Sequence, residues 1–121
     1  MILVVDDQEN MCWILSKVLQ EAGFSVKTVG TAKEALFIAT SNRVSATIID
    51  YRLPDKNGLD LFLELRKLKP KIQGVLITSY GSKEIREKAL QLGFHAYFDK
   101  PFQNQALITA LQACLTNVIG N

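Results

Sequence analysis

Two adjacent carboxylates, Asp6 and Asp7, follow the first apolar run of the chain, ILVV. Asp50 ends a second such run, ATIID, and Lys100 ends a third, AYFDK. Neighbouring anions repel each other and stay ionised only where water or a cation compensates them. Carboxylate oxygens suit Mg²⁺, and a lysine amine can contact a phosphate group. These residue types predict a site for a divalent cation and a phosphoryl group, in which a carboxylate could attack phosphorus.

Short apolar runs alternate along the chain with stretches of helical periodicity. They predict strands at residues 2–5, 25–29, 46–49, 74–77 and 96–98. The first, third and fourth runs show almost no polar alternation, which is typical of parallel strands covered on both faces. Five β-α units in strict order predict an α/β, doubly wound fold with a five-stranded parallel sheet and right-handed crossovers.

The helices are predicted from apolar spacing and capping residues. Apolar residues recur from Met11 to Ala22 at offsets of three and four, which forms a single stripe. Capping residues, glycines or apolar spacing predict that the other four helices begin near Thr31, Gly58, Ser82 and Gln103. Leu59 and Leu63 lie off the stripe of the third helix, so we expect both to be exposed.

Ligands of open α/β sheets bind at the carboxyl ends of the strands. The predicted strand ends carry three acids, a hydroxyl pair and an amine: Asp6, Asp7, Asp50, Thr78, Ser79 and Lys100. A hydroxyl at this edge could donate a hydrogen bond to a phosphoryl oxygen. The topology therefore predicts that residues far apart in the chain form one site.

The composition indicates a globular domain spanning residues 1–121. Hydrophobic residues make up 48% and charged residues 21%, and the formal net charge is +2, so we expect no nucleic acid partner. Cys12 and Cys114 lack CxxC spacing and are expected to be buried or free thiols in a cytoplasmic protein. No run is long enough for a transmembrane helix. We interpret a small basic cluster as a solvated helix end: Arg66, Lys67, Lys69 and Lys71.

Four short motifs together resemble the receiver domain of two-component response regulators, the CheY-like family. They are the acid pair at Asp6, D-x-x-L-P-x-x-x-G from Asp50, T-S-Y-G from Thr78 and Y-x-x-K-P-F from Tyr97. The resemblance covers the whole chain. In detail, the chain is most similar to the receivers of NtrC-type transcriptional regulators. It implies a flavodoxin-like sheet with strand order 2-1-3-4-5.

The resemblance also implies a reaction. Asp50 would accept a phosphoryl group from the phosphohistidine of a sensor histidine kinase. Magnesium would be ligated by Asp7, Asp50 and the backbone carbonyl of Arg52, while Asp6 would act mainly through bound water. The domain would promote its own phosphorylation and dephosphorylation without being an enzyme for a separate substrate.

The same family pattern implies a conformational switch. Lys100 and Thr78, followed by Ser79, would contact the phosphoryl group, and Tyr97 would rotate inward as Thr78 moves. The Lys100–Pro101 peptide bond would be cis. The family can dimerise through the fourth helix, the fifth strand and the fifth helix.

Four side chains are interpreted individually. Arg52 and Tyr80 are bulky and are expected to hinder the water that removes the phosphoryl group. Trp13 lies off the stripe of the first helix and is a candidate kinase contact, with local packing as the alternative. Asp99 stands where many receivers carry an apolar residue, and we expect it to be exposed on an edge strand.

Three other functions fit the sequence less well. A phosphate-silent, receiver-like interaction module would have lost an acidic or lysine position, and all are present. A phosphatase of the dehalogenase type would need D-x-D after the first strand, where this chain has DDQ. A flavodoxin-like cofactor binder would need a loop rich in Gly, Ser and Thr at that place.

Overall fold

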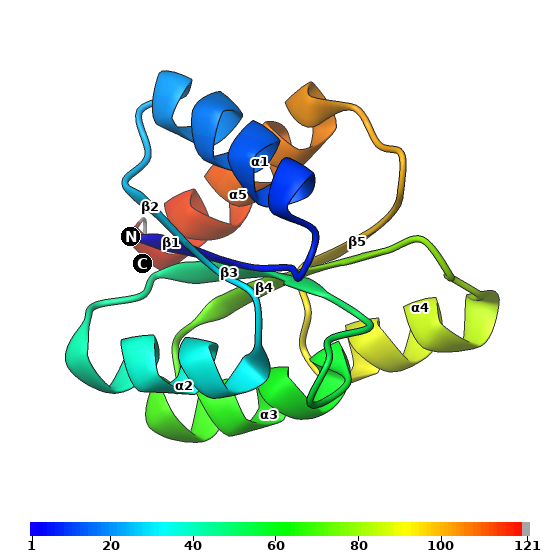
Figure 1. The fold of residues 1–121 in the computed structure, drawn as a ribbon. Helices are drawn as coiled ribbons and strands as arrows, with labels where there is room; N and C mark the ends of the chain where they lie inside the picture. Colours follow the sequence, from blue (N-terminus) through cyan, green and yellow to red (C-terminus); the bar gives the residue numbers. More distant parts are fainter. Residues whose placement is uncertain (120–121) are drawn as a thin grey trace.

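The computed structural model describes residues 1–119, with side chains described as far as residue 116, and strands alternate with helices throughout (Figure 1). The strands are β1 (Ile2–Val5), β2 (Val26–Val29), β3 (Ala46–Asp50), β4 (Gln73–Thr78) and β5 (Ala96–Asp99). The helices are α1 (Glu9–Glu21), α2 (Ala32–Ser41), α3 (Gly58–Leu68), α4 (Lys83–Gln91) and α5 (Asn104–Ile119). Among the described residues, no helix is both long enough and apolar enough to span a bilayer.

All five strands are parallel and lie in the order β2-β1-β3-β4-β5, as predicted. Helices α1 and α5 cover one face of this sheet, and α2, α3 and α4 cover the other (Figure 1). The carboxyl ends of β1, β3, β4 and β5 therefore meet at one edge.

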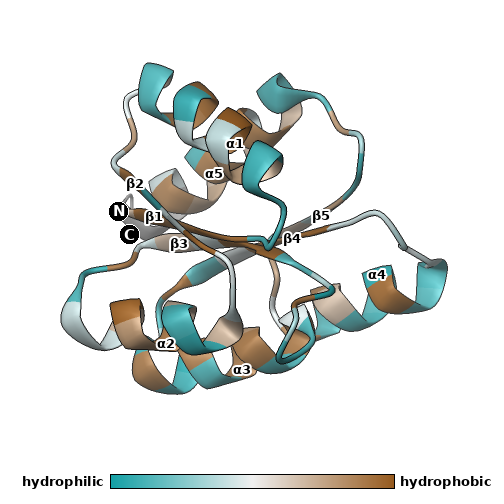
Figure 2. Ribbon diagram, in the orientation of Figure 1, coloured by the Kyte–Doolittle hydropathy of each residue, from teal (hydrophilic) through white to brown (hydrophobic). Residues whose placement is uncertain are grey.

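The core consists of two apolar layers, one on each side of the sheet. Every residue of β1 is buried. Because successive strand residues point to opposite faces, Ile2 and Val4 pack in the layer under α1 and α5, and Leu3 and Val5 pack in the layer under α2 and α3. Figure 2 shows the result: the central strands are apolar, whereas the helices carry apolar and polar stripes.

The strand ends differ from the predicted bounds. Strands β3, β4 and β5 each extend one residue further, through Asp50, Thr78 and Asp99. Backbone hydrogen bonds continue at this edge, since the Lys100 N–H donates to the Thr78 carbonyl at 2.8 Å. The functional side chains therefore project from the ordered ends of strands or from the first two residues after them.

Leu59 is buried, so the expectation that it would be exposed is wrong, whereas Leu63 is exposed as expected. Helix α3 packs against α2 as well as against the sheet. A larger part of the α3 surface is therefore buried than its single apolar stripe suggests. The same helix begins in close contact with β3. A Cβ atom on Gly58 would lie 2.6 Å from the Asp50 carbonyl oxygen, which explains the need for glycine there.

The Lys100–Pro101 peptide bond is cis, as the resemblance implied. Cys12 and Cys114 are free cysteines, and Cys114 is buried. The apolar spacing of α5 also predicts Val118 on its inner face, but this residue lies outside the described side chains.

Candidate functional site

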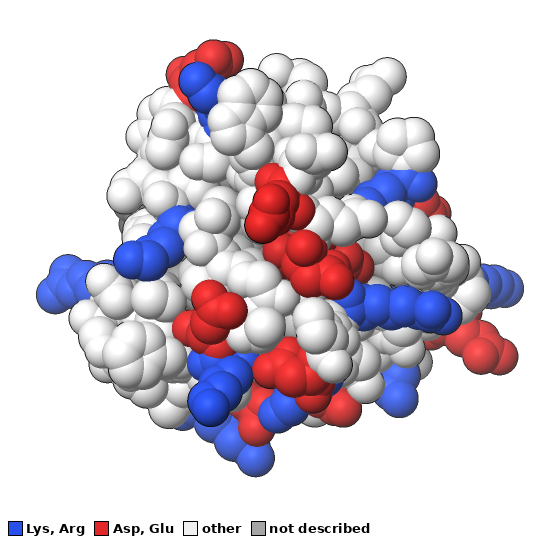
Figure 3. Space-filling view, viewed as in Figure 1, with Lys and Arg blue, Asp and Glu red and all other residues white. Residues whose placement is uncertain are grey.

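Three carboxylates meet at the carboxyl edge of the sheet. Asp6 and Asp7 follow β1, and Asp50 ends β3; one ligand oxygen of each lies within 4.8 Å of the others. Asp6 and Asp50 are buried, whereas Asp7 is exposed. Figure 3 shows acidic side chains gathered across the middle of this face, between the upper and lower helix layers. The structure thus brings together the three acids that the sequence predicted.

The amine of Lys100 lies between two of these acids. Its Nζ atom donates to Asp6 Oδ2 at 2.8 Å and to Asp50 Oδ2 at 3.1 Å, and its side chain is only 7% exposed. It also donates to Gln8 Oε1 at 3.0 Å. Gln8 was not singled out from the sequence, and its position directly after the acid pair is the only signal for it. The contacts orient the lysine toward Asp50.

Burial and the charge of Asp6 raise the pKa of Asp50, and the nearby Lys100 opposes this effect. Burial alone would lower the pKa of Lys100, but its hydrogen bonds and attraction to Asp6 and Asp50 outweigh burial and raise it. With all groups ionised, the three acids and one amine leave two net negative charges. One divalent cation would balance them, so the oxygen-rich site fits Mg²⁺ in charge and ligand type.

The loop after Asp50 is held in place by several contacts. The Asp50 carboxylate accepts a hydrogen bond from the Arg52 N–H at 3.2 Å, and Arg52 forms an antiparallel bridge with Asn57. Asp55 extends from this loop to the start of α2, where it accepts from the backbone N–H groups of Ala32 at 2.9 Å and Lys33 at 3.0 Å. Sequence reasoning missed Asp55, because nothing local marks a contact across 22 or more residues.

The hydroxyl groups at the edge lie on β4 and the loop that follows. Thr78 is fully buried, and its Oγ1 atom accepts from the Tyr80 N–H at 3.0 Å. Ser79 is exposed in the loop. Tyr97 lies on the neighbouring strand, half-buried, and its hydroxyl donates to Asp99 at 2.7 Å. Asp99 is exposed on the edge strand, as expected.

Two aromatic residues flank the site. The Arg52 guanidinium lies over the Tyr80 ring, 4.2 Å from its centroid. Trp13 is 64% exposed, and Lys17 lies over its ring at 5.3 Å. Trp13 also lines a hollow of about 580 Å³ that includes Asp6 and Asp7. The structure thus favours exposure over local packing for Trp13.

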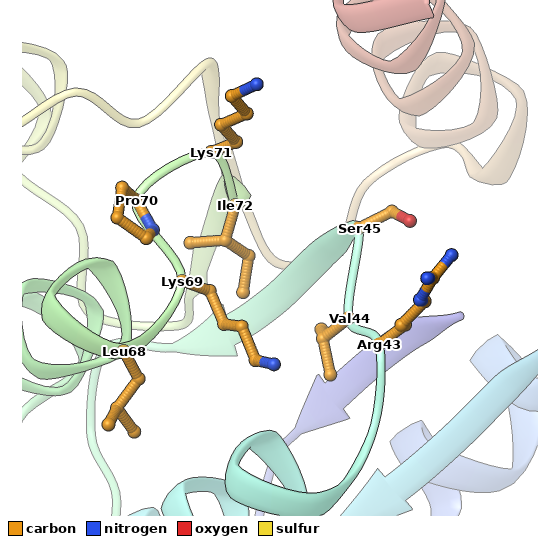
Figure 4. A pocket seen from close by; sticks show the side chains of 8 residues that line it. All are labelled: Arg43, Val44, Ser45, Leu68, Lys69, Pro70, Lys71 and Ile72. Atoms are coloured by element: carbon orange, nitrogen blue, oxygen red, sulfur yellow. The ribbon is translucent and has the colours of Figure 1, made fainter.

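The basic cluster lies at the opposite edge of the sheet. Lys69 and Lys71, together with Arg43, surround a hollow of about 500 Å³ with an apolar lining (Figure 4). The interpretation as a solvated helix end is wrong for Arg66. Its guanidinium donates to the Ile72 carbonyl at 2.9 Å and lies over the Phe62 ring, so it serves packing.

A parallel sheet in this order, with three acids and a lysine at its carboxyl edge, defines the CheY-like class of α/β signalling domains. The chain belongs to the response regulator receiver domain family, whose model matches residues 2–112. It is therefore a receiver of the kind used in two-component signal transduction.

The relatives agree with this assignment. The chain is 32% identical over 116 residues to a putative NtrX-like response regulator of Rickettsia bellii, covering 93% of this chain and 24% of that protein. The chain thus spans about a quarter of the length of that relative. Its fold matches the beryllofluoride-activated NtrC4 receiver domain dimer with a TM-score of 0.91 and 26% identity, covering 96% of each chain.

A further match is a Burkholderia pseudomallei response regulator with a phosphorylated aspartic acid and a calcium ion. The TM-score is 0.85 and the identity is 28%, covering 98% of this chain and 70% of that one.

Proposed function

We propose that residues 1–121 form a single receiver domain that accepts a phosphoryl group on Asp50 from a sensor histidine kinase. The observation that carries this proposal is the position of the Lys100 amine, 3.1 Å from Asp50 Oδ2, beside two further carboxylates. A buried amine there can orient the acceptor and contact an incoming phosphoryl oxygen. The phosphate-silent alternative is less favoured, because every chemical group that the reaction needs is present.

We assign the cation site to Asp6, Asp7, Asp50 and the backbone carbonyl of Arg52. Mg²⁺, when bound, would supply the positive charge that offsets the carboxylates and the oxygens of the phosphoryl donor. The calcium ion of the Burkholderia pseudomallei relative supports a divalent site in this fold. Asp7 is the exposed member of the cluster, which suits direct contact with an ion that keeps several water ligands.

The proposed transfer forms a bond between an Asp50 carboxylate oxygen and phosphorus. The phosphorus–nitrogen bond of the donor phosphohistidine breaks, and the imidazole leaves with the electron pair and takes up a proton. Lys100 would donate hydrogen bonds to the oxygens on phosphorus as charge builds up there. Water later attacks phosphorus, releases inorganic phosphate and restores the Asp50 carboxylate.

The new group would carry more negative charge and three acceptor oxygens in place of one carboxylate oxygen. We assign Thr78 and Ser79 to contacts with these oxygens and Tyr97 to an inward rotation that follows. A shift from mostly one state to mostly the other needs about 5 kcal/mol of differential interaction. A few charge-assisted hydrogen bonds of about 1.5–3 kcal/mol each would supply it.

The partner proposals follow the same reasoning. Trp13, exposed beside the acids, would contact the kinase, and a second copy would bind through α4, β5 and α5. The dimer formed by the NtrC4 receiver supports dimerisation in this family, and the choice of surface is our proposal. We further propose that the domain is cytoplasmic, binds no nucleic acid or membrane itself, and controls an output in transcription regulation.

Acetyl phosphate and Mg²⁺, followed by intact-mass measurement, would test the central proposal. The wild type should gain one phosphoryl group, whereas Asp50→Asn should gain none. In a second measurement, beryllofluoride should bind to the wild type in the presence of Mg²⁺ and should not bind to Asp50→Asn. A wild type that stays unmodified and binds no beryllofluoride would contradict the function.

A further inference from the structure

Asp99 is an acid at the same sheet edge that the proposed phosphoryl chemistry leaves without a role. It precedes Lys100 and is paired in register with Thr78 on β4. Its carboxylate does not join the cluster of Asp6, Asp7 and Asp50 but accepts the hydroxyl hydrogen bond of Tyr97, with 2.7 Å between the oxygens. The acid therefore acts on the aromatic residue to which we assigned the switch.

Gly81 lies directly against this pair. A Cβ atom on Gly81 would stand 1.7 Å from the Tyr97 hydroxyl oxygen and 2.0 Å from Asp99 Oδ1. Such distances cannot occur between real atoms, so any larger residue at position 81 would displace the pair. The backbone of Gly81 is not in the left-handed region, so space rather than conformation explains the glycine. Its missing side chain leaves room for the hydroxyl–carboxylate contact.

The contact lies next to the start of α4. Gly81 precedes Ser82, whose side chain accepts from the Ile85 N–H at 3.1 Å and caps that helix. Ala89 is the only residue of α4 that is buried, so few core contacts hold the helix on the sheet. The Tyr97–Asp99 pair therefore lies beside the amino end of a helix that has few core contacts.

We propose that Asp99 holds the Tyr97 hydroxyl at the protein surface beside Gly81 and thereby opposes the switch, an inference that rests on the proposed function of Asp50. The carboxylate of Asp99 is exposed, and moving a charge into the interior is costly. Tyr97 cannot turn inward while it keeps this hydrogen bond unless Asp99 is buried with it. The hydrogen bond must break first, so it stabilises the form with Tyr97 outward. Asp99 is thus a positioning residue that acts through Tyr97.

Beryllofluoride titration in Mg²⁺, followed by calorimetry, tests this inference on three single variants. Asp99→Ala removes the acceptor, Tyr97→Phe removes the donor while keeping the ring, and Gly81→Ala displaces the pair while keeping both groups. Each variant should bind beryllofluoride about threefold to tenfold more tightly than the wild type, the range expected for one net hydrogen bond. Glu21→Ala, which removes an exposed acid at the far end of α1, should leave the affinity unchanged.

The double variant Asp99→Ala/Tyr97→Phe should bind no more tightly than either single variant, because both remove the same interaction. A merely structural role for Asp99 would lower the melting temperature without raising the affinity. Unchanged or weaker binding by Asp99→Ala, or additive effects in the double variant, would overturn the inference. A wild type that binds no beryllofluoride would instead contradict the proposed function.

Discussion

The Arg52 guanidinium lies over the Tyr80 ring, 4.2 Å from its centroid, and this contact joins the loops that follow β3 and β4. Arg52 stands two residues after Asp50, and Tyr80 stands two residues after Thr78. Both side chains are exposed, so neither belongs to the core. The pair is therefore well placed to limit the approach of water to a phosphorylated Asp50.

The double variant Arg52→Ala/Tyr80→Ala should lose its phosphoryl group faster than the wild type. We expect an increase of about threefold to tenfold in the dephosphorylation rate, equivalent to about 0.7–1.4 kcal/mol in the barrier. The measurement is the decay of the phosphorylated form by intact mass after removal of acetyl phosphate. Equal decay rates in both proteins would show that the pair does not hinder water.

Lys100→Met should destabilise the protein when no divalent cation is present. The substitution leaves the buried carboxylates of Asp6 and Asp50 without their amine, which costs about 3 kcal/mol in comparable buried pairs. Urea unfolding with a chelator measures this loss, and added Mg²⁺ should stabilise the variant more than the wild type. If Mg²⁺ raised the free energy of unfolding equally in both proteins, Lys100 and the cation would not be compensating the same carboxylates.

Asp55→Ala should lower the free energy of unfolding by about 1 kcal/mol, because the carboxylate caps two backbone N–H groups at the start of α2. Asp55→Asn, which keeps an acceptor oxygen, should lose less. The hydrogen bond from Ala32 is the main cause that lowers the pKa of Asp55. Its contribution is therefore full above the ordinary aspartate pKa of about 4 and is lost as the pH falls further.

Unfolding of the wild type and of Asp55→Ala at pH 6 and at acidic pH would test the cap. The difference between the two proteins should shrink on acidification. A constant difference would show that Asp55 acts through packing and not through its charged form.

Tyr97 should ionise at an unusually high pH. Burial, followed by the hydrogen bond to Asp99 and its negative charge, raises the pKa of Tyr97 to about 12. Because the folded pKa lies above the ordinary value of about 10, the stabilisation is present below pH 10 and is lost as the pH rises through 12. The pH dependence of near-ultraviolet absorbance, compared between the wild type and Tyr97→Phe, isolates the ionisation of Tyr97. In Asp99→Ala the midpoint of this ionisation should move to lower pH.

Much of the site could be predicted before the fold was known. Asp50 and Lys100 are far apart in the chain, yet both follow apolar runs that had to be parallel strands, and parallel strands in one sheet end at a common edge. The alternation of strand and helix periods was enough to place them together. The exact strand ends were less predictable, because one added backbone hydrogen bond extends a strand without any change in apolar pattern.

The sequence by itself determined the alternation of parallel strands and helices and the meeting of Asp6, Asp7 and Asp50 with Lys100 at one edge, since these depend on periodicity and chain order, while the strand order was implied by the family resemblance. The tertiary structure alone decided the contact of Gln8 with Lys100, the cap that Asp55 places on α2, and the binding of Tyr97 by Asp99 beside Gly81. Those contacts depend on loop paths and side-chain rotamers, which are chosen by neighbours distant in the chain and leave no periodic mark in it.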